Sequence, residues 1–145
     1  MPHKRGEWVE KIKEVDREYS AVRIAVDRLL ADTQSRGGTV SFRDLSRASE
    51  LLEGTFIIRL FAEFETGLRS YWATVRDTHP KTEDLVNGVA ARRHIPDDLI
   101  QGVHAVRIHR NSLVHERSSS GDLRDISEAK IALDRFMRRL PPEWV

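Results

Sequence analysis

Hydrophobic residues recur at intervals of three and four along most of the chain, which is the spacing of one face of an α-helix. The first such stretch predicts a helix of about 25 residues. Its apolar positions are Trp8, Ile12, Val15, Tyr19, Val22, Val26 and Leu29. Gly37 and Gly38 after Arg36 predict its end, and Ser41 followed by Asp44 predicts the N-cap of a second helix.

The second stretch has a broad apolar and aromatic face, which predicts the central helix of the fold. Its members are Leu52, Phe56, Ile57, Leu60, Phe61, Phe64, Leu68, Tyr71, Trp72 and Val75. Pro80 predicts that this helix ends before His79, because the residue ahead of a proline avoids helical angles. Residues 81–87 are polar, and Thr82 is a candidate cap for a short turn there.

A third helix is predicted to begin at Pro96 and to continue to about His115. A serine-rich loop follows, and a fourth apolar stripe between Ile126 and Leu140 predicts a last helix that Pro141 ends. No stretch alternates apolar and polar residues for long enough to predict a strand. We therefore expect a single all-α domain over residues 1–145, an up-down bundle of four to five helices.

Composition narrows the function classes. The chain has no cysteine, so disulfides, thiolate metal sites and cysteine nucleophiles are excluded. The formal net charge is +1, so any contact with a polyanion must be local. No apolar run approaches the roughly 20 residues of a membrane span, and the N-terminus leads into no apolar signal region. We expect a cytoplasmic protein with no membrane association.

The candidate chemistry lies on the third predicted helix. Projected at about 100° per residue, its apolar arc has Arg110 near the middle, and a guanidinium there needs a partner, a cleft or a second subunit. His104, Asn111 and His115 fall together on the neighbouring face, with Arg107 at its edge. An imidazole can take a proton from a ribose 2′-hydroxyl while an arginine stabilises charge on the phosphate, so these residue types suit RNA cleavage without a metal.

The segment from Arg110 to His115 resembles the R-x4–6-H signature of HEPN domains, including the polar Asn111 directly after the arginine. The stretch from Phe61 to Leu68 is similar to the acidic and aromatic segment on the second helix of many members. The resemblance implies a HEPN-like helical bundle and a homodimer in which two motifs form one composite site. It also implies a metal-independent endoribonuclease, as in toxins and phage defence.

Roles for individual residues follow from the same resemblance. His115 would transfer the proton, Arg110 would stabilise the phosphate, Asn111 would orient the imidazole, and Glu65 would orient His115 or Arg110. The product ends would be a 2′,3′-cyclic phosphate and a 5′-hydroxyl. No cofactor is expected, and His104 and His115 are too far apart along the helix for a zinc site.

Residues 92–117 hold five arginines and four histidines against three acids, so RNA could dock there. The candidates for contacting RNA are Arg107, His104 and Arg117. Many HEPN toxins act with a nucleotidyltransferase-type antitoxin, which is the implied protein partner. Toxins that such a partner inactivates by AMP transfer commonly have a tyrosine where this chain has Arg117, so that form of control is in doubt.

The same residues also fit purely structural roles. Arg110 could be a core arginine paired with Glu53, His115 could only cap its helix, and the cationic stretch could be a solvated face. The alternative functions are a catalytically inactive HEPN module that binds protein or nucleic acid, and an unrelated helical interaction protein. If the motif does pair across subunits, the apolar arc around Arg110 would be the subunit seam.

Overall fold

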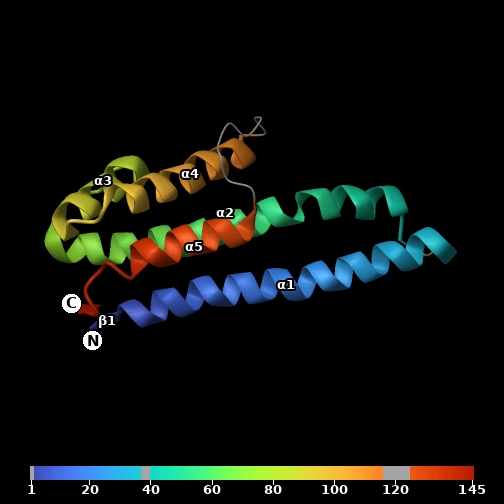
Figure 1. Ribbon diagram of the computed structural model, residues 1–145, viewed down its shortest axis with the longest axis horizontal. Helices are drawn as coiled ribbons and strands as arrows, with labels where there is room; N and C mark the ends of the chain where they lie inside the picture. The colour runs from blue at the N-terminus through green and yellow to red at the C-terminus, as the bar shows by residue number, and fades with distance from the viewer. Residues whose placement is uncertain (1, 37–39, 116–124) are drawn as a thin grey trace.

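The computed structural model describes residues 2–36, 40–115 and 125–145, and five helices account for most of them (Figure 1). They are α1 (Arg5–Arg36), α2 (Phe42–Val75), α3 (Thr82–Arg93), α4 (Asp97–Val114) and α5 (Ile126–Met137). The helices α1, α2, α4 and α5 alternate in direction, so the predicted all-α up-down bundle is confirmed, with α3 as a short fifth helix.

The predicted helix ends agree closely with the structure. The side chain of Ser41 accepts a hydrogen bond from the backbone N–H of Asp44 at 3.3 Å, so the predicted N-cap of α2 is confirmed. The helix α2 ends at Val75, before His79 and Pro80. Pro96 is the N-cap of α4 rather than its first helical residue.

Two predictions about local structure were wrong. Residues 82–93 form the helix α3 rather than a short turn, because four side chains of this stretch are buried against the bundle. They are Leu85, Val86, Val89 and Ala90. The chain also has a two-residue antiparallel pairing between β1 (His3–Lys4) and β2 (Glu143–Trp144), which brings the two ends of the chain together.

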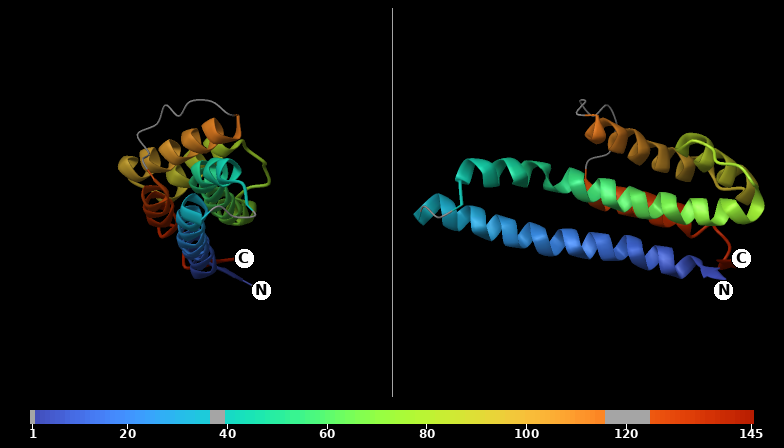
Figure 2. Two further views of the ribbon diagram at one scale, coloured as in Figure 1. Left: turned by 90° about the vertical axis from the view of Figure 1, so that its right-hand side faces the viewer. Right: turned by 180° about the vertical axis from the view of Figure 1, so that it is seen from behind.

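The core fills the space between α1, α2, α4 and α5, with α2 in contact with all the other helices (Figure 2). Phe64 lies at its centre, with its ring 5.7 Å from that of Phe61 and 5.6 Å from that of Phe136 on α5. Trp8, Tyr71 and Trp144 are buried as well, so none of these aromatic rings is available to stack on a base.

The second half of α1 and the first half of α2 extend beyond the rest of the bundle as a two-helix hairpin (Figure 1). Val22 and Leu29, which belong to the predicted apolar stripe of α1, are exposed because α4 and α5 do not reach this far. Within the described residues, no helix is both long and apolar enough to span a membrane.

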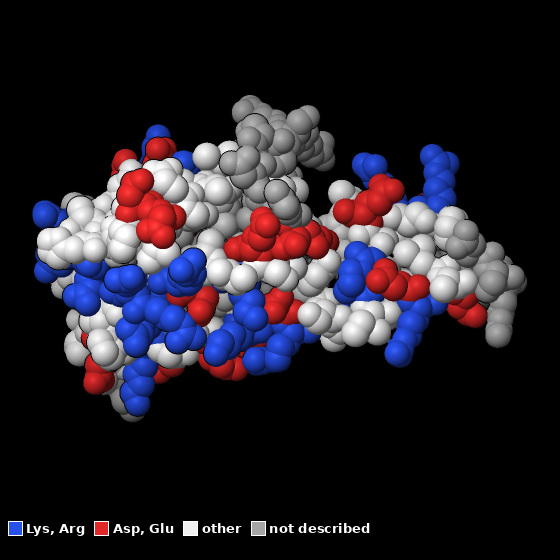
Figure 3. Space-filling model, in the orientation of Figure 1, with Lys and Arg blue, Asp and Glu red and all other residues white. Residues whose placement is uncertain are grey.

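Charged side chains are spread over the whole surface, but their signs separate locally (Figure 3). Basic side chains gather over the end of α5 and the beginning of α1, while acidic side chains lie mostly above this group, with a few between and below its members. The electrostatic potential therefore differs from one part of the surface to another, although the net charge is only +1.

Candidate functional site

The helix α4 carries the Arg110–His115 motif through its last two turns. Arg110 and Asn111 are helical, and His115 is the C-cap, whose backbone N–H donates to the carbonyl of Asn111 at 3.1 Å. The His115 side chain is exposed. An exposed imidazole at a helix end is free to meet a ligand, and this position also fits the simple capping role.

Arg110 lies against α2. Its guanidinium carbon is 4.9 Å from the centroid of the Phe61 ring, and its Nη2 is 3.9 Å from Oε2 of Glu65. The side chain is about one quarter exposed, and its Nε is buried with no hydrogen-bond partner among the described residues. The guanidinium is therefore fixed in place while part of its donor capacity remains unused.

The position of Arg110 corrects two expectations. Its counter-ion is Glu65 on α2, whereas Glu53 accepts a hydrogen bond from the Tyr19 hydroxyl at 3.0 Å instead. The part of the apolar arc that precedes Arg110 belongs to the core of a single chain and is not a subunit seam, because its members are buried against the other helices. Those members are Leu99, Val103 and Val106.

Glu65 connects α2, α3 and α4 through its two carboxylate oxygens. Its Oε1 accepts from Nη2 and Nε of Arg69 at 2.9 and 3.2 Å and from the Thr82 hydroxyl at 2.9 Å. Its Oε2 faces Arg110. Arg69 also donates to the carbonyl of Pro80 at 3.0 Å. Glu65 therefore lies beside Arg110, one of the two residues it was predicted to orient.

His104 and Arg107 form a second polar group, which faces α3. Nε2 of His104 is 2.8 Å from Oδ1 of Asn87, and Nε of Arg107 donates to Nδ1 of His104 at 3.2 Å. Nη2 of Arg107 lies 3.7 Å from a carboxylate oxygen of Glu83. Burial, and then the charge of Arg107, lower the pKa of His104, while Glu83 acts in the opposite direction. Because Nδ1 accepts from Arg107, this hydrogen-bond pattern corresponds to a neutral imidazole whose proton is on Nε2 and is donated to Asn87.

The predicted residues on α4 therefore have different partners. Arg110 joins Glu65 on the α2 side, and His104 joins Arg107 on the α3 side. Asn111 is half-buried and, in the described ranges, makes no side-chain hydrogen bond to His115. Arg117 lies outside the described residues.

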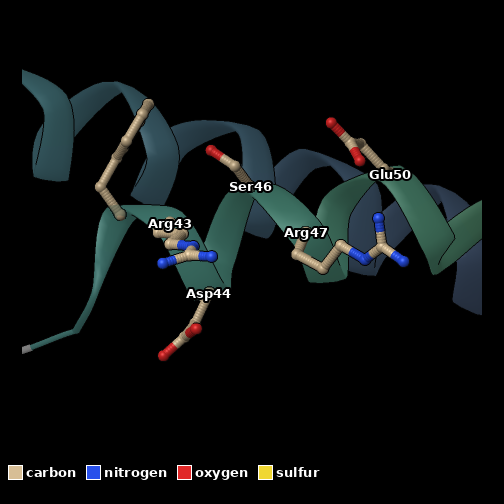
Figure 4. Close-up of a pocket in the computed structure, with 6 residues that line it drawn as sticks. Arg43, Asp44, Ser46, Arg47 and Glu50 are labelled. Atoms are coloured by element: carbon tan, nitrogen blue, oxygen red, sulfur yellow. The ribbon is translucent and has the colours of Figure 1, made fainter.

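A surface hollow outside the motif lies along the start of α2 (Figure 4). Its lining residues are Phe42, Arg43, Asp44, Ser46, Arg47 and Glu50. Figure 4 shows these side chains spaced along one helix rather than converging on a point. Glu50 precedes Glu65 by about 22 Å along α2, so this hollow is separate from the motif.

Sequence reasoning missed several polar residues that the fold brings into position. Arg69 is four residues after Glu65, a helical spacing that predicts their contact. Three arginines lie within five residues near the end of the last predicted helix: Arg135, Arg138 and Arg139. This spacing could have predicted a basic surface at the end of that helix.

No group of three or more His, Asp or Glu side chains in the described parts of the chain could hold a metal ion. The comparisons with protein-family models, with curated proteins and with solved structures found no match to this chain.

Proposed function

We propose that the protein is a metal-independent endoribonuclease of HEPN type that acts as a homodimer, in which the Arg110–His115 motifs of two copies share one RNA phosphate. The observation that carries the proposal is the state of Arg110. Its guanidinium is fixed between Phe61 and Glu65 with a buried Nε that has no partner among the described residues, and the exposed His115 caps the same helix five residues later. The R-x4–6-H resemblance supplies the chemistry.

In the proposed reaction the ribose 2′-oxygen attacks the adjacent phosphorus and the bond from phosphorus to the 5′-oxygen breaks. The His115 imidazole takes the proton of the 2′-hydroxyl, and water or the second imidazole of the pair returns a proton to the 5′-oxygen. Arg110 stabilises the negative charge on the phosphate oxygens. The products are a 2′,3′-cyclic phosphate and a 5′-hydroxyl, and water is not consumed.

Neighbouring contacts support a positioning role for Glu65. Arg69 and Thr82 occupy its Oε1, so the carboxylate cannot rotate freely and its Oε2 stays directed at Arg110. His104 and Arg107 would contact RNA from the α3 side, and Arg117 would extend the same cationic stretch. A toxin role and a nucleotidyltransferase-type antitoxin belong to the same proposal, as does a cytoplasmic location.

The test is cleavage of a structured RNA in the presence of EDTA. His115→Ala is expected to lower the rate by about 10²–10⁴-fold, because it removes the proton-transfer group. His79→Ala is the matched control, since His79 is an exposed histidine outside the motif, and it should cleave at the wild-type rate. Cleavage that survives His115→Ala would remove His115 from the mechanism.

The second candidate function is a catalytically silent module of the same fold. The observation that favours it is that Arg110 already has intramolecular partners on α2. In that case Arg110 serves stability and the protein cleaves no RNA at any concentration.

Arg110→Met separates the two candidates. A part-exposed ion pair at 3.9 Å and one cation–π contact are each worth about 1 kcal/mol or less, and the buried Nε offsets part of that gain. We therefore expect the free energy of unfolding to change by no more than about 1 kcal/mol, with the loss falling on cleavage. A larger loss of stability, with no activity in the wild type, favours the silent module.

A further inference from the structure

Arginines from three separate parts of the chain meet at the end of α5. Nη1 of Arg5, at the start of α1, donates to the carbonyls of Arg138 and Leu140 at 2.8 and 2.9 Å. Nε of Arg93, the last residue of α3, donates to the carbonyl of Arg139 at 3.1 Å. Together with the arginines of the α5 end itself they form what we name the α5-end cluster: Arg5, Arg93, Arg135, Arg138 and Arg139.

Most of the positive charge of the α5-end cluster is not paired with a carboxylate in the described residues. In the part of the chain that the structure describes, Arg138 is the one member of the cluster with an ion pair, to Asp134 at 2.9 Å. Arg5 and Arg93 are held by neutral carbonyls, which fix the guanidinium groups without cancelling their charge. Arg135 and Arg139 are exposed, and basic side chains dominate this part of the surface (Figure 3).

Helix capping accounts for only part of the cluster. Cations near the last carbonyls of a helix are favourable, and Arg5 and Arg93 already supply those hydrogen bonds. Among the described residues, the side chains of Arg135 and Arg139 donate no hydrogen bond to a carbonyl or a carboxylate. The remaining arginines therefore hold positive charge that the fold itself does not use.

We propose that the α5-end cluster binds the phosphate backbone of RNA. This inference rests on the proposed function and adds where the substrate is held outside the cleavage motif. The cluster contains arginine and no lysine, and the planar guanidinium fork matches phosphate oxygens two at a time. Several cations at one end of the molecule also suit a ligand with regularly repeated charge, and each phosphate bound releases counterions.

The α5-end cluster lies near the beginning of α4, whereas the Arg110–His115 motif lies at the end of α4. Arg135 lines a groove between α4 and α5 together with Asp98 and Leu99, near the beginning of α4. Asp98 precedes Arg110 by about 18 Å along the helix axis. An RNA of several nucleotides can contact both places, whereas a dinucleotide can occupy only one. The cluster is therefore expected to matter for long substrates alone.

The experiment measures binding of a 20-nucleotide unstructured RNA, labelled with fluorescein, by fluorescence anisotropy in EDTA. The full chain carries His115→Ala so that binding is measured without cleavage. Arg135→Ser/Arg139→Ser should weaken binding at least tenfold at low salt and should reduce the slope of log affinity against log salt by about 1.4. Arg43→Ser/Arg47→Ser, at the far end of the hairpin, removes the same charge and should stay within twofold.

Arg135→Lys/Arg139→Lys is the second variant, and it should keep the wild-type salt slope because it keeps the charge. Circular dichroism checks that each variant is folded. Wild-type affinity in Arg135→Ser/Arg139→Ser overturns the inference, as does an equal loss in the hairpin control. A polyglutamate peptide that displaces the RNA at equal charge concentration also overturns it, because the cluster would then bind acidic protein.

Cleavage assays distinguish a failure of RNA binding by the α5-end cluster from a failure of the proposed nuclease activity. With His115 restored, Arg135→Ser/Arg139→Ser should cleave a dinucleotide at the wild-type rate and should show a raised KM for the 20-nucleotide RNA. An equal loss on both substrates contradicts a backbone-binding role. If the wild type cleaves neither substrate yet binds RNA through the cluster, the binding inference stands and the nuclease proposal fails.

Discussion

Glu65 on α2 makes polar contacts with residues of α2, α3 and α4 near the motif. Its contact with Arg69 follows from helical spacing alone and could be predicted from the sequence. Its contacts with Thr82 and Arg110 depend on how α2 packs against α3 and α4. Helical projection places both Glu53 and Glu65 near the core, and only the packed structure shows which of them faces Arg110.

His104 is expected to make the free energy of unfolding depend on pH. Burial lowers its folded-state pKa below 6.5, so as the pH falls the unfolded chain binds a proton before the folded chain does. The free energy of unfolding should therefore decrease as the pH drops from 6.5 toward the lowered pKa, and the contribution is fully present above 6.5. Urea unfolding at pH 7.5 and 5.5 measures the change.

The comparison variant for that experiment is His104→Gln, which should lose less stability than the wild type between the two pH values. His79→Gln controls for an exposed histidine and should follow the wild type. Equal pH dependence in the wild type and His104→Gln would show that the His104 imidazole is not responsible. A neutral imidazole cannot attract phosphate by charge, and Asn87 and Arg107 already occupy both ring nitrogens of His104. A hydrogen bond from His104 to RNA would therefore require one of these two contacts to break.

At the scale of elements, apolar periodicity predicted the long helices because it is a local property of the chain. It did not predict α3, whose buried positions are too few to stand out in a polar segment. It also assigned Val22 and Leu29 to the core, although the hairpin extends past the helices that would cover them. Which part of an apolar stripe is buried depends on the lengths of its neighbours.

Close approach of α2 to its neighbours depends on Gly67. A Cβ at this position would lie 2.9 Å from the methyl carbon of Met137 and 3.1 Å from the Trp8 ring. Gly67→Ala should therefore lower the free energy of unfolding by about 1–3 kcal/mol, because overpacking outweighs the better helix propensity of alanine. Chemical denaturation measures the change.

Gly102 is the matched control for this substitution. A Cβ there would lie 3.5 Å from Ala132, an ordinary contact distance, so Gly102→Ala should raise stability by up to about 1 kcal/mol. The opposite signs test the packing argument, since both changes add one methyl group to a helix. A stabilised Gly67→Ala would mean that Trp8 and Met137 move aside at little cost.

At the scale of the whole molecule, the motif lies near the middle of the long axis, where α4 ends against the hairpin (Figure 1). Two exposed apolar side chains lie on this part of α4, Ile108 and Val114, with 42% and 49% of their surface exposed. They flank Arg110 on the same helix. A second copy that covers them would bring two motifs together, as the proposed composite site requires.

That requirement predicts the effect of Ile108→Gln/Val114→Gln. Full burial of such a side chain contributes about 1.5–3 kcal/mol, and Ile108 and Val114 have roughly half of their surface left to bury. Because the change affects two side chains in each copy, it should still weaken self-association at least tenfold and lower RNA cleavage with it. Ile24→Gln/Ile131→Gln removes two somewhat more exposed apolar side chains from α1 and α5 and should leave the dimer intact. Sedimentation velocity measures the assembly state. Cleavage by a variant that sediments as a monomer would contradict the shared site, because one copy would then carry every group that the reaction needs.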